Sequence, residues 1–290
     1  MSGPVVQGPA APAGAGMQGP APPAGAGGGA PAGPGRSPGG AVCVVGLGPG
    51  DPRYLTPAAA EALAAATDLI GYAPYVARIP ERPGLVRHAS DNRVEVERAR
   101  HALALAAVGR RVAVVSGGDP GVFAMAAALF EALEGGDPAW RALPITVEPG
   151  ITAMLAAAAR AGAPLGGDFC ALSLSDNLKP WEVITARLDA VLRADLVIAL
   201  YNPISQARPW QLGAALGHAA EHRAPDTPVI LARAIGRPDE SLRILPLAEA
   251  RDAPADMATL VIIGSSATRL VPREGAPPFV YTSRRVEAAR

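Results

Sequence analysis

Short apolar runs alternate with longer amphipathic segments from Ala41 onward. Runs rich in aliphatic and β-branched residues are typical of buried strands, and apolar positions three to four apart predict helices between them. Strands are expected at residues 41–47, 68–71, 112–116, 145–147, 170–174, 196–200, 229–232, 242–245 and 259–264. Helices are expected to begin at Thr56-Pro57 and to cover about 92–108, 121–133, 151–161, 180–192 and 209–222. This alternation predicts an α/β protein with largely parallel sheets.

Turn-forming residues interrupt the alternation once. The stretch GAPLGGD, Gly162 to Asp168, contains the glycines and proline that commonly connect domains. We therefore predict an N-terminal α/β domain over 41–163 and a C-terminal α/β domain over 167–272.

Both ends of the chain differ from this pattern. The first 40 residues contain 13 glycines and 9 prolines, with Arg36 as their single charge. Such a composition cannot bury enough apolar surface to offset the entropy of ordering, so a disordered tail is expected over 1–40. The strand and helix pattern also fades after Val271, and residues 273–290 are expected to form a loose C-terminal tail.

The composition limits the function. Of 290 residues, 49% are hydrophobic and 18% charged, and 26 basic residues balance 26 acidic ones. Zero net charge disfavours nucleic-acid binding, and no apolar run reaches the roughly 18 residues that span a membrane. Cys43 and Cys170 lie in apolar runs, as buried thiols in a reducing cytoplasm would. No Cys/His cluster has zinc spacing, so no metal is expected.

Loops of small residues follow several predicted strands. Their sequences are GLGPGDP, SGGDPGVF, EPGITA, LYNP and IIGSS. Tight turns need glycine and proline whether or not a ligand binds. However, ligands of open α/β sheets bind at the carboxyl ends of strands, and small residues let the backbone approach a flat ligand closely. The five loops together favour a binding site at these strand ends.

The first loop does not fit a dinucleotide fingerprint. That pattern places glycines at positions one, three and six, but Gly46 and Gly48 are followed by Asp51 at the sixth position. Asp51, and Asp119 in the SGGDP loop, would repel a diphosphate. A cationic ligand of nucleoside size, such as S-adenosylmethionine, fits these loops better.

Longer segments resemble a known family. VVGLGPGDPRYLTPAAAEAL, VVSGGDPGVFAMA, VEPGITAMLAAAARAGAPLGGDF and VIALYNP are similar to the tetrapyrrole (corrin/porphyrin) methylases, over about Ala41 to Leu270. The resemblance implies two domains, each with a mostly parallel sheet and flanking helices, with the methyl donor in the cleft between them, and a homodimer. SDNRVEVERARHAL, SLSDNLKPWEVI and LYNPIS followed by RPWQL resemble the members that act on precorrin-3B. The implied reaction is methylation at C(17) with ring contraction in cobalamin biosynthesis.

The resemblance also assigns roles to single residues. The positions that match the family's binding loops for the donor, S-adenosylmethionine, are Pro49, Gly118, Asp119, Val122, Thr152, Ala153, Tyr201, Asn202 and Ala232. Lys179, the only lysine of the chain, departs from the family pattern and receives no role.

Methyl transfer from a sulfonium needs alignment rather than a nucleophilic side chain. Ring contraction needs a proton donor or acceptor, for which His88 and Asp176 are the candidates. Asp176 equally fits a helix cap or turn. The remaining histidines, His101, His218 and His222, are expected on solvated helix faces.

Arginines are expected to bind the carboxylates of a precorrin-3B or related tetrapyrrole acceptor. Arg53, Arg87 and Arg93 lie near the loops, and a guanidinium pairs with a carboxylate through two hydrogen bonds. Arg93 equally fits the start of a solvated helix, paired with Glu97.

Three other functions stay open from the sequence. A sister tetrapyrrole methyltransferase would keep the donor loops and change the acceptor segments. A dinucleotide-binding oxidoreductase would bind NADH instead of S-adenosylmethionine. A tetrapyrrole carrier would bind the macrocycle and leave its mass unchanged.

Overall fold

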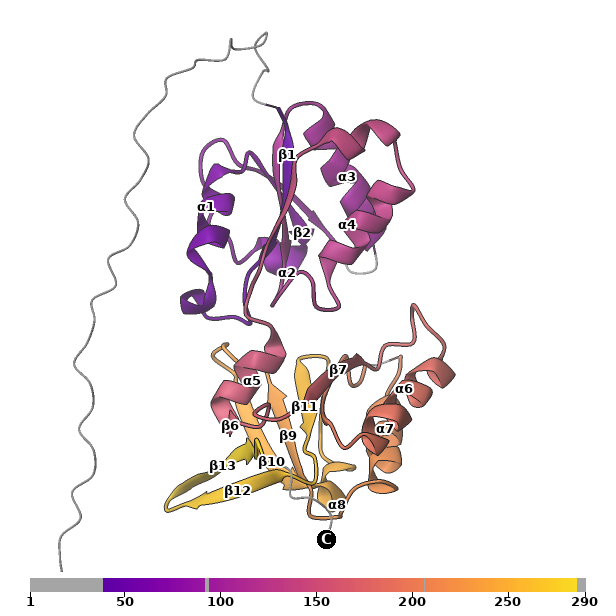
Figure 1. The fold of residues 1–290 in the computed structure, drawn as a ribbon. Helices are drawn as coiled ribbons and strands as arrows, with labels where there is room; N and C mark the ends of the chain where they lie inside the picture. The colour runs from indigo at the N-terminus through magenta and orange to yellow at the C-terminus, as the bar shows by residue number, and fades with distance from the viewer. Residues whose placement is uncertain (1–38, 92–93, 206, 286–290) are drawn as a thin grey trace, which may run out of the picture. The chain divides into compact units, whose positions relative to one another are not determined.

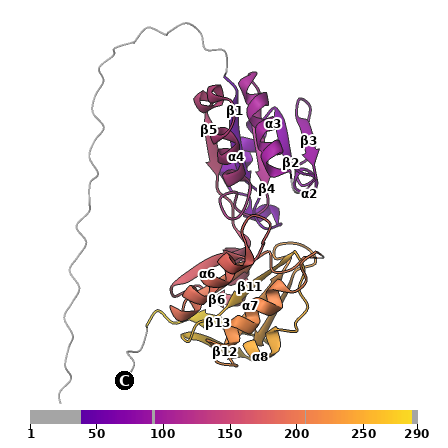
Figure 2. The same ribbon diagram turned by 90° about the vertical axis from the view of Figure 1, so that its right-hand side faces the viewer.

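The first sheet is entirely parallel. In this computed structural model, which describes residues 39–91, 94–205 and 207–285, the strand order is β3-β2-β4-β1-β5 (Figures 1 and 2). The strands are β1 (Ala41–Gly46), β2 (Asp68–Tyr72), β3 (Val86–Ser90), β4 (Arg111–Ser116) and β5 (Ile145–Glu148). Each of the four neighbouring pairs is parallel. The expected parallel sheet is confirmed here, although β3 was expected as a loop.

Helices cover both faces of this sheet. Val42 and Val44 of β1 pack with α3 (Glu95–Ala107) and α4 (Met125–Glu134). Val45 of the same strand points to the other face, where α1 (Pro57–Ala65) and α2 (Ala73–Val76) pack. Successive side chains of a strand alternate between faces, so a strand buried on both sides reads as a continuous apolar run.

The second sheet is mixed, with the order β10-β9-β11-β8-β7. Its strands are β7 (Phe169–Ser173), β8 (Val197–Tyr201), β9 (Pro228–Arg233), β10 (Ser241–Pro246) and β11 (Thr259–Ile263). Only β7 and β8 are parallel; the other three pairs are antiparallel. The expectation of a mostly parallel second sheet is therefore wrong. Residues 234–240 join β9 to β10, and a link this short cannot make the crossover that a parallel pair needs.

One face of the second sheet packs against α6 (Trp181–Arg193), α7 (Gln211–Ala220) and α8 (Leu247–Ala250). The other face packs against α5 (Ala153–Ala161), which follows β5 in the chain (Figure 1). The chain thus passes from one core to the other before α5. The boundary predicted within 162–168 lies one helix too late.

A small third sheet follows the second. It has the order β12-β13-β6, with β12 (Thr268–Arg273), β13 (Ala276–Thr282) and β6 (Gly162–Ala163). Val280 is fully buried, and the Thr282 hydroxyl donates to the Pro164 carbonyl at 2.6 Å. The loose tail expected from residue 273 is therefore wrong for residues 276–282. A strand that contains two consecutive prolines gives little sequence signal, and its burial depends on pairing with β6, more than a hundred residues earlier.

Two short 3₁₀ helices, Pro52–Tyr54 and Pro138–Ala142, complete the described elements. Within the described residues, no helix is both long and apolar enough to span a membrane. Most of the tail predicted for residues 1–40 lies outside the described residues.

Candidate functional site

The loops after β1 and β4 are joined through their backbones. The Gly48 amide donates to the Gly118 carbonyl at 3.1 Å, and the Gly118 amide donates to the Gly48 carbonyl at 2.9 Å. Because β1, β4 and β5 are neighbouring parallel strands, their carboxyl ends meet at one edge. The GLGPGDP, SGGDPGVF and EPGITA loops therefore form one group.

Glycine is required in this group for two physical reasons. A Cβ on Gly150 would lie 2.2 Å from the Gly118 carbonyl oxygen, and one on Gly46 would lie 2.6 Å from the Gly150 nitrogen. Gly118 has space for a Cβ, with Thr152 Cα at 3.6 Å, but its φ of +67° disfavours any residue with a side chain. The backbones of the three loops therefore pack directly against one another.

Asp119 fastens two of these loops together. Its Oδ1 accepts a hydrogen bond from the Gly121 amide at 2.8 Å, and its Oδ2 accepts one from the Gly150 amide at 3.0 Å. Each carboxylate oxygen is thus engaged by a backbone amide. Asp119 therefore holds the loops after β4 and β5 in position, and its carboxylate also places a negative charge among them.

Phe123 lies beside Tyr201 and was not selected from the sequence. Its φ of +52° is unusual for a bulky residue, and such strained backbone is concentrated at functional sites. Its half-exposed ring lies 5.2 Å from the Tyr201 ring, centroid to centroid. Val122 precedes it and is partly exposed. Sequence offers no signal for a positive φ at phenylalanine.

Tyr201, at the end of β8, caps the start of α5. Its hydroxyl lies 2.6 Å from Thr152 Oγ1 and accepts a hydrogen bond from the Met154 amide at 3.1 Å. Burial raises the pKa of Tyr201, so the phenol stays protonated at neutral pH. Tyr201, of the YN pair, thus contacts Thr152, of the TA pair, and the donor-binding role that the resemblance implied for both pairs stays a prediction.

Polar groups gather at the adjoining ends of β7 and β8. Asn202, with a φ of +51°, donates from Nδ2 to Ser173 Oγ at 2.9 Å. Asp176 accepts from the Arg208 guanidinium at 2.8 Å and from the Gln211 amide at 3.3 Å. The Arg208 hydrogen bond lowers the pKa of Asp176, so this carboxylate is ionised at neutral pH. It can accept a proton or stabilise a cation, and it is a poor acid.

Arg208 was not selected from the sequence. Its guanidinium also donates to Ser175 Oγ at 2.9 Å, which places a cation among the loops after β7 and β8. The sequence analysis recognised the RPWQL segment that begins with Arg208. It could not predict the contact between Arg208 and Asp176, because these residues are more than thirty positions apart in the sequence.

Two tryptophans begin the helices next to these loops. Trp181 starts α6, Trp210 precedes α7, and their rings stack edge to face at 4.7 Å. The loop before α6 carries Leu178, which is 98% exposed. In the same loop, burial and then the charge of Arg187 lower the pKa of Lys179.

His88 and Arg87 do not reach the carboxyl edge. His88 lies in β3 and contacts Asp68, the first residue of β2, at 2.9 Å. Arg87 donates to Glu81 and to the carbonyls of Val76 and Ile79. Both side chains therefore have structural partners away from the glycine loops, because β3 is a strand rather than the loop we expected.

The other expected residues are scattered. Arg53 is 82% exposed and pairs with Asp51 at 2.7 Å. Pro49 faces the link after β9, where the Arg237 guanidinium lies 3.5 Å from its carbonyl oxygen. Ala232 lies in β9 with its side chain in the core. Arg93 lies outside the described residues.

Comparison with known proteins decides the family. The family model of the tetrapyrrole (corrin/porphyrin) methylases matches residues 41–251. The chain belongs to this family. The methylase resembles a precorrin-3B C(17)-methyltransferase from Sinorhizobium sp, with 58% identity over 81% of the chain and 92% of the relative. The resemblance inferred from the sequence is thereby confirmed. The predicted enzyme class, a methyltransferase that acts on tetrapyrroles, is confirmed with it.

Other relatives agree. The cobalamin biosynthesis protein CobIJ of Mycobacterium tuberculosis is 49% identical over 83% of the chain. The matched segment covers 47% of CobIJ. A probable cobalt-factor III C(17)-methyltransferase of Salmonella typhimurium is 38% identical, covering 76% of the chain and 90% of the relative.

Solved structures confirm the fold class. The crystal structure of the methyltransferase CobJ superposes with a TM-score of 0.78 and 53% identity, over 84% of the chain and all of CobJ. A uroporphyrin-III C-methyl transferase from Thermus thermophilus, complexed with S-adenyl homocysteine, superposes with a TM-score of 0.61 and 23% identity. The match covers 78% of the chain and 97% of that protein. The second likeness concerns the fold alone.

Proposed function

We propose that this methylase transfers the methyl group of S-adenosylmethionine to C(17) of precorrin-3B and contracts the ring to precorrin-4, in cobalamin biosynthesis. One observation carries the proposal: 58% identity to the Sinorhizobium precorrin-3B C(17)-methyltransferase over 92% of that protein. The methyl carbon leaves sulfur for the ring carbon, and S-adenosylhomocysteine departs. The sulfonium is already activated, so the protein has to align the reactants and exclude water.

The donor is assigned to the glycine loops and the residues around Tyr201. Close backbone packing of Gly46, Gly118 and Gly150 supports this, because loops of small residues at the carboxyl edge of a parallel sheet let a flat ligand approach their backbone closely. The assignment extends to Pro49, Asp119, Val122, Thr152, Ala153, Tyr201, Asn202 and Ala232. For Ala232 only the backbone is a contact, since its side chain is buried.

The acceptor is assigned to the loops after β7 and β8. Asp176, ionised beside Arg208, is the better supported acid/base candidate, acting as a base or as a charge that stabilises a cationic intermediate. His88 has weaker support because Asp68 already holds its imidazole. Arg208 joins Arg53 and Arg93 as a candidate partner of the acceptor's carboxylates, and Arg87 has weaker support because Glu81 and two backbone carbonyls already hold its guanidinium.

The reaction itself is the direct test. The protein is incubated with S-adenosylmethionine and precorrin-3B, and the product is followed by mass and absorption spectrum. We expect one added methyl group and the altered spectrum of a contracted ring. Cobalt-factor III, named for the 38% identical relatives, serves as a second acceptor. Faster turnover of cobalt-factor III would reassign the substrate, and NADH binding without methyl transfer would reject the enzyme class.

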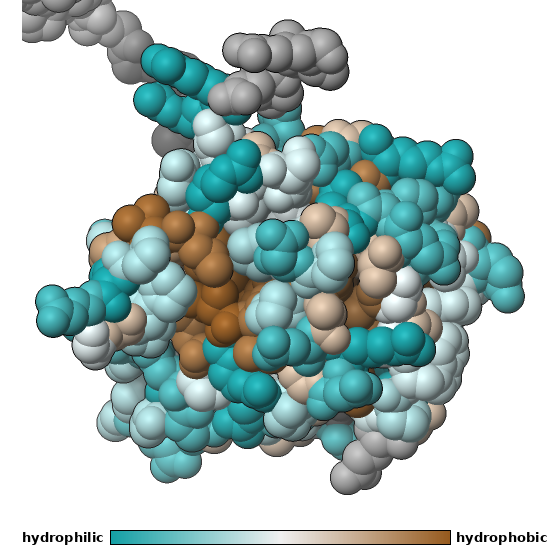
Figure 3. Space-filling view, turned by 90° about the horizontal axis from the view of Figure 1, so that it is seen from below, coloured by the Kyte–Doolittle hydropathy of each residue, from teal (hydrophilic) through white to brown (hydrophobic). Residues whose placement is uncertain are grey.

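A homodimer in the cytoplasm is the proposed working form. The hairpin β12–β13 exposes Leu270, Val271 and Phe279, and Figure 3 shows hydrophobic surface on the face of the molecule seen from below. Exposed apolar patches often mark protein interfaces. Cys43 and Cys170 are free thiols, as expected in a reducing compartment. Light scattering on the purified chain tests the dimer.

A further inference from the structure

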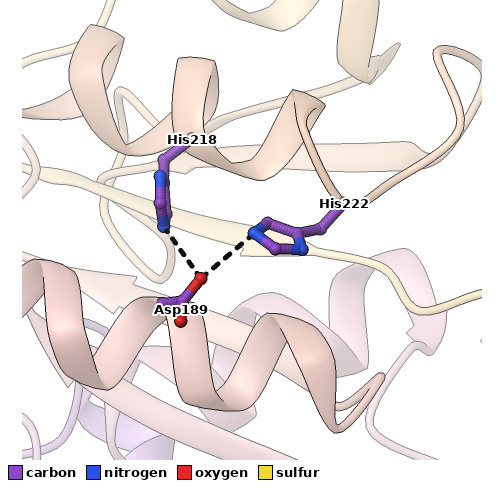
Figure 4. Close-up of side chains that lie close together, drawn as sticks. All are labelled: Asp189, His218 and His222. Atoms are coloured by element: carbon purple, nitrogen blue, oxygen red, sulfur yellow. Dashed lines mark ion pairs between the residues drawn. The ribbon is translucent and has the colours of Figure 1, made fainter.

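Three side chains able to bind a metal converge where α6 and α7 pack together (Figure 4). Asp189 lies in α6, His218 in the last turn of α7, and His222 just beyond that helix. Asp189 Oδ1 is 3.6 Å from His218 Nε2 and 3.2 Å from His222 Nε2. All three potential ligand atoms lie within 4.8 Å of one another. The two histidines were expected on solvated surface, but they are half-buried and face a carboxylate.

Hydrogen bonding does not account for this arrangement. Neither imidazole makes a hydrogen bond to Asp189 among the bonds of the described residues, and His218 Nε2 is buried with no hydrogen-bond partner. A buried polar atom without a partner is unfavourable. A cation between the three side chains would give His218 Nε2 a partner, and no hydrogen bond would have to be broken to admit it.

Two of the three separations suit a tetrahedral ion, and the third, between the two histidine nitrogens, is at most 4.8 Å. Zinc binds imidazole nitrogen and carboxylate oxygen at about 2.0–2.2 Å, which places neighbouring ligand atoms roughly 3.3–3.5 Å apart. The separations of 3.2 and 3.6 Å from Asp189 to the two histidines lie close to that range. Two imidazoles with one carboxylate favour zinc or a similar first-row ion over magnesium and calcium, which prefer oxygen ligands.

The surroundings also orient the ligands. His218 Nδ1 faces Glu221 at 3.7 Å, and a carboxylate opposite the second ring nitrogen is a common feature of metal-bound histidine. Arg193 pairs with Asp189 Oδ2 at 2.9 Å, which leaves Oδ1 directed at the histidines. Each of the three candidate ligands is about one quarter exposed, so an ion can enter from solvent.

We propose that Asp189, His218 and His222 form a site for Zn²⁺ or a similar divalent transition-metal ion, with solvent as the fourth ligand. Asp189 follows Trp181 by eight residues, about 12 Å along α6. The site is therefore separate from the loops assigned to the acceptor. It would fasten α6 to α7 at one end, while Trp181 and Trp210 contact each other at the other end.

The test uses the full chain stripped of metal with a chelator. Calorimetric titration with ZnCl₂ should give one Zn²⁺ per chain, and the thermal midpoint should rise with Zn²⁺ but not with Mg²⁺. His222→Gln should weaken Zn²⁺ binding by more than about 100-fold, because even outer partners of metal ligands contribute 10–100-fold. His222 lies outside the helix, so the fold should survive, which far-UV circular dichroism checks.

Two controls make the result specific. Asp189→Asn keeps the side-chain size and should also lose Zn²⁺ binding, while His101→Gln, a histidine exposed on α3, should bind as the natural chain does. Absence of saturable Zn²⁺ binding would overturn the proposal. So would unchanged affinity in folded His222→Gln and Asp189→Asn, or a loss confined to His101→Gln.

Discussion

Single glycines determine how closely the loops of the methylase approach one another. Gly46 and Gly150 are required because a Cβ would collide with backbone, whereas Gly118 is required because of its positive φ. These two causes have different consequences for substitution. A clash deforms the whole loop group, while a disfavoured φ adds strain at one residue and leaves the neighbouring loops in place.

Gly118→Ala should therefore leave a folded protein with weakened donor binding. The strain of a positive φ costs about 1–2 kcal/mol, and the new methyl group lies beside the proposed donor site. Calorimetry with S-adenosylhomocysteine should show at least a roughly tenfold loss, equivalent to about 1.4 kcal/mol.

Gly109→Ala is the matched control for this change. Gly109 has a φ of +90° and open space around its Cβ position, but it precedes β4 at the opposite end from Gly118. The Gly109→Ala variant should lose about as much free energy of unfolding as Gly118→Ala, and it should bind the donor as tightly as the unchanged chain does. Equal donor affinity in both folded variants would remove Gly118 from the donor site.

At the scale of elements, a buried carboxylate joins β2 to its neighbours. Asp68 is 2% exposed and accepts hydrogen bonds from Arg110 at 2.7 Å and Thr67 at 2.8 Å, while His88 lies 2.9 Å away. Burial alone would raise the pKa of Asp68, but the hydrogen bonds from Arg110, His88 and Thr67 outweigh it and lower that pKa. The network links the start of β2 to β3 and to the residue before β4.

This lowered pKa gives stability a definite pH dependence. The contribution of Asp68 is present above the unfolded-state pKa of about 3.9 and is lost as the pH falls through the lower folded-state pKa. Asp68→Asn should therefore lower the free energy of unfolding at pH 7 by roughly 1.5–3 kcal/mol, and stability should then fall less steeply below pH 4. Urea denaturation at several pH values measures both effects. Asp239→Asn, which breaks an exposed pair with Arg233, should have a much smaller effect.

The hairpin β12–β13 leads to a further prediction. A chain ending at Gly275 loses the buried Val280 and the hydroxyl pair Thr268–Thr282, whose oxygens are 2.9 Å apart. Burial of a valine contributes about 1.5–3 kcal/mol and each hydrogen bond about 1 kcal/mol. The free energy of unfolding is therefore expected to fall by roughly 3–5 kcal/mol. A chain ending at Ser283 should keep its stability, as judged by thermal unfolding. Equal stability of the two would support the loose tail first expected here.

Sequence reasoning succeeded where a signal is local. The glycine loops, the Thr56 cap of α1 and most strands follow from spacing and residue type. It failed where the decisive partner is distant in sequence. Arg208 pairs with Asp176, α5 packs on the sheet that follows it rather than on the sheet that precedes it, and β13 pairs with β6. Neither periodicity nor composition encodes such pairings.

At the scale of the whole molecule, the described fold begins at Gly39, just before β1. The described residues from Gly39 onward belong to one compact unit, which contains every described residue assigned to donor or acceptor. A chain beginning at Gly39 should therefore methylate its acceptor at a rate within about twofold of the full chain, because a tail of this composition has too little apolar surface to contribute to a core. Steady-state turnover of the two chains compares them. A much slower shortened chain would assign the tail a role in the reaction.

The basic residues of the molecule are almost all arginines. Lys179, in the loop between β7 and α6, is the only lysine among 26 lysines and arginines. Guanidinium groups do not react with amine-directed reagents under mild conditions, because they stay protonated. The natural chain therefore carries a single side-chain amine, two residues before Trp181 and beside the loops assigned to the acceptor. A fluorescent dye attached to that amine would report occupancy of the macrocycle site optically, without any engineered residue.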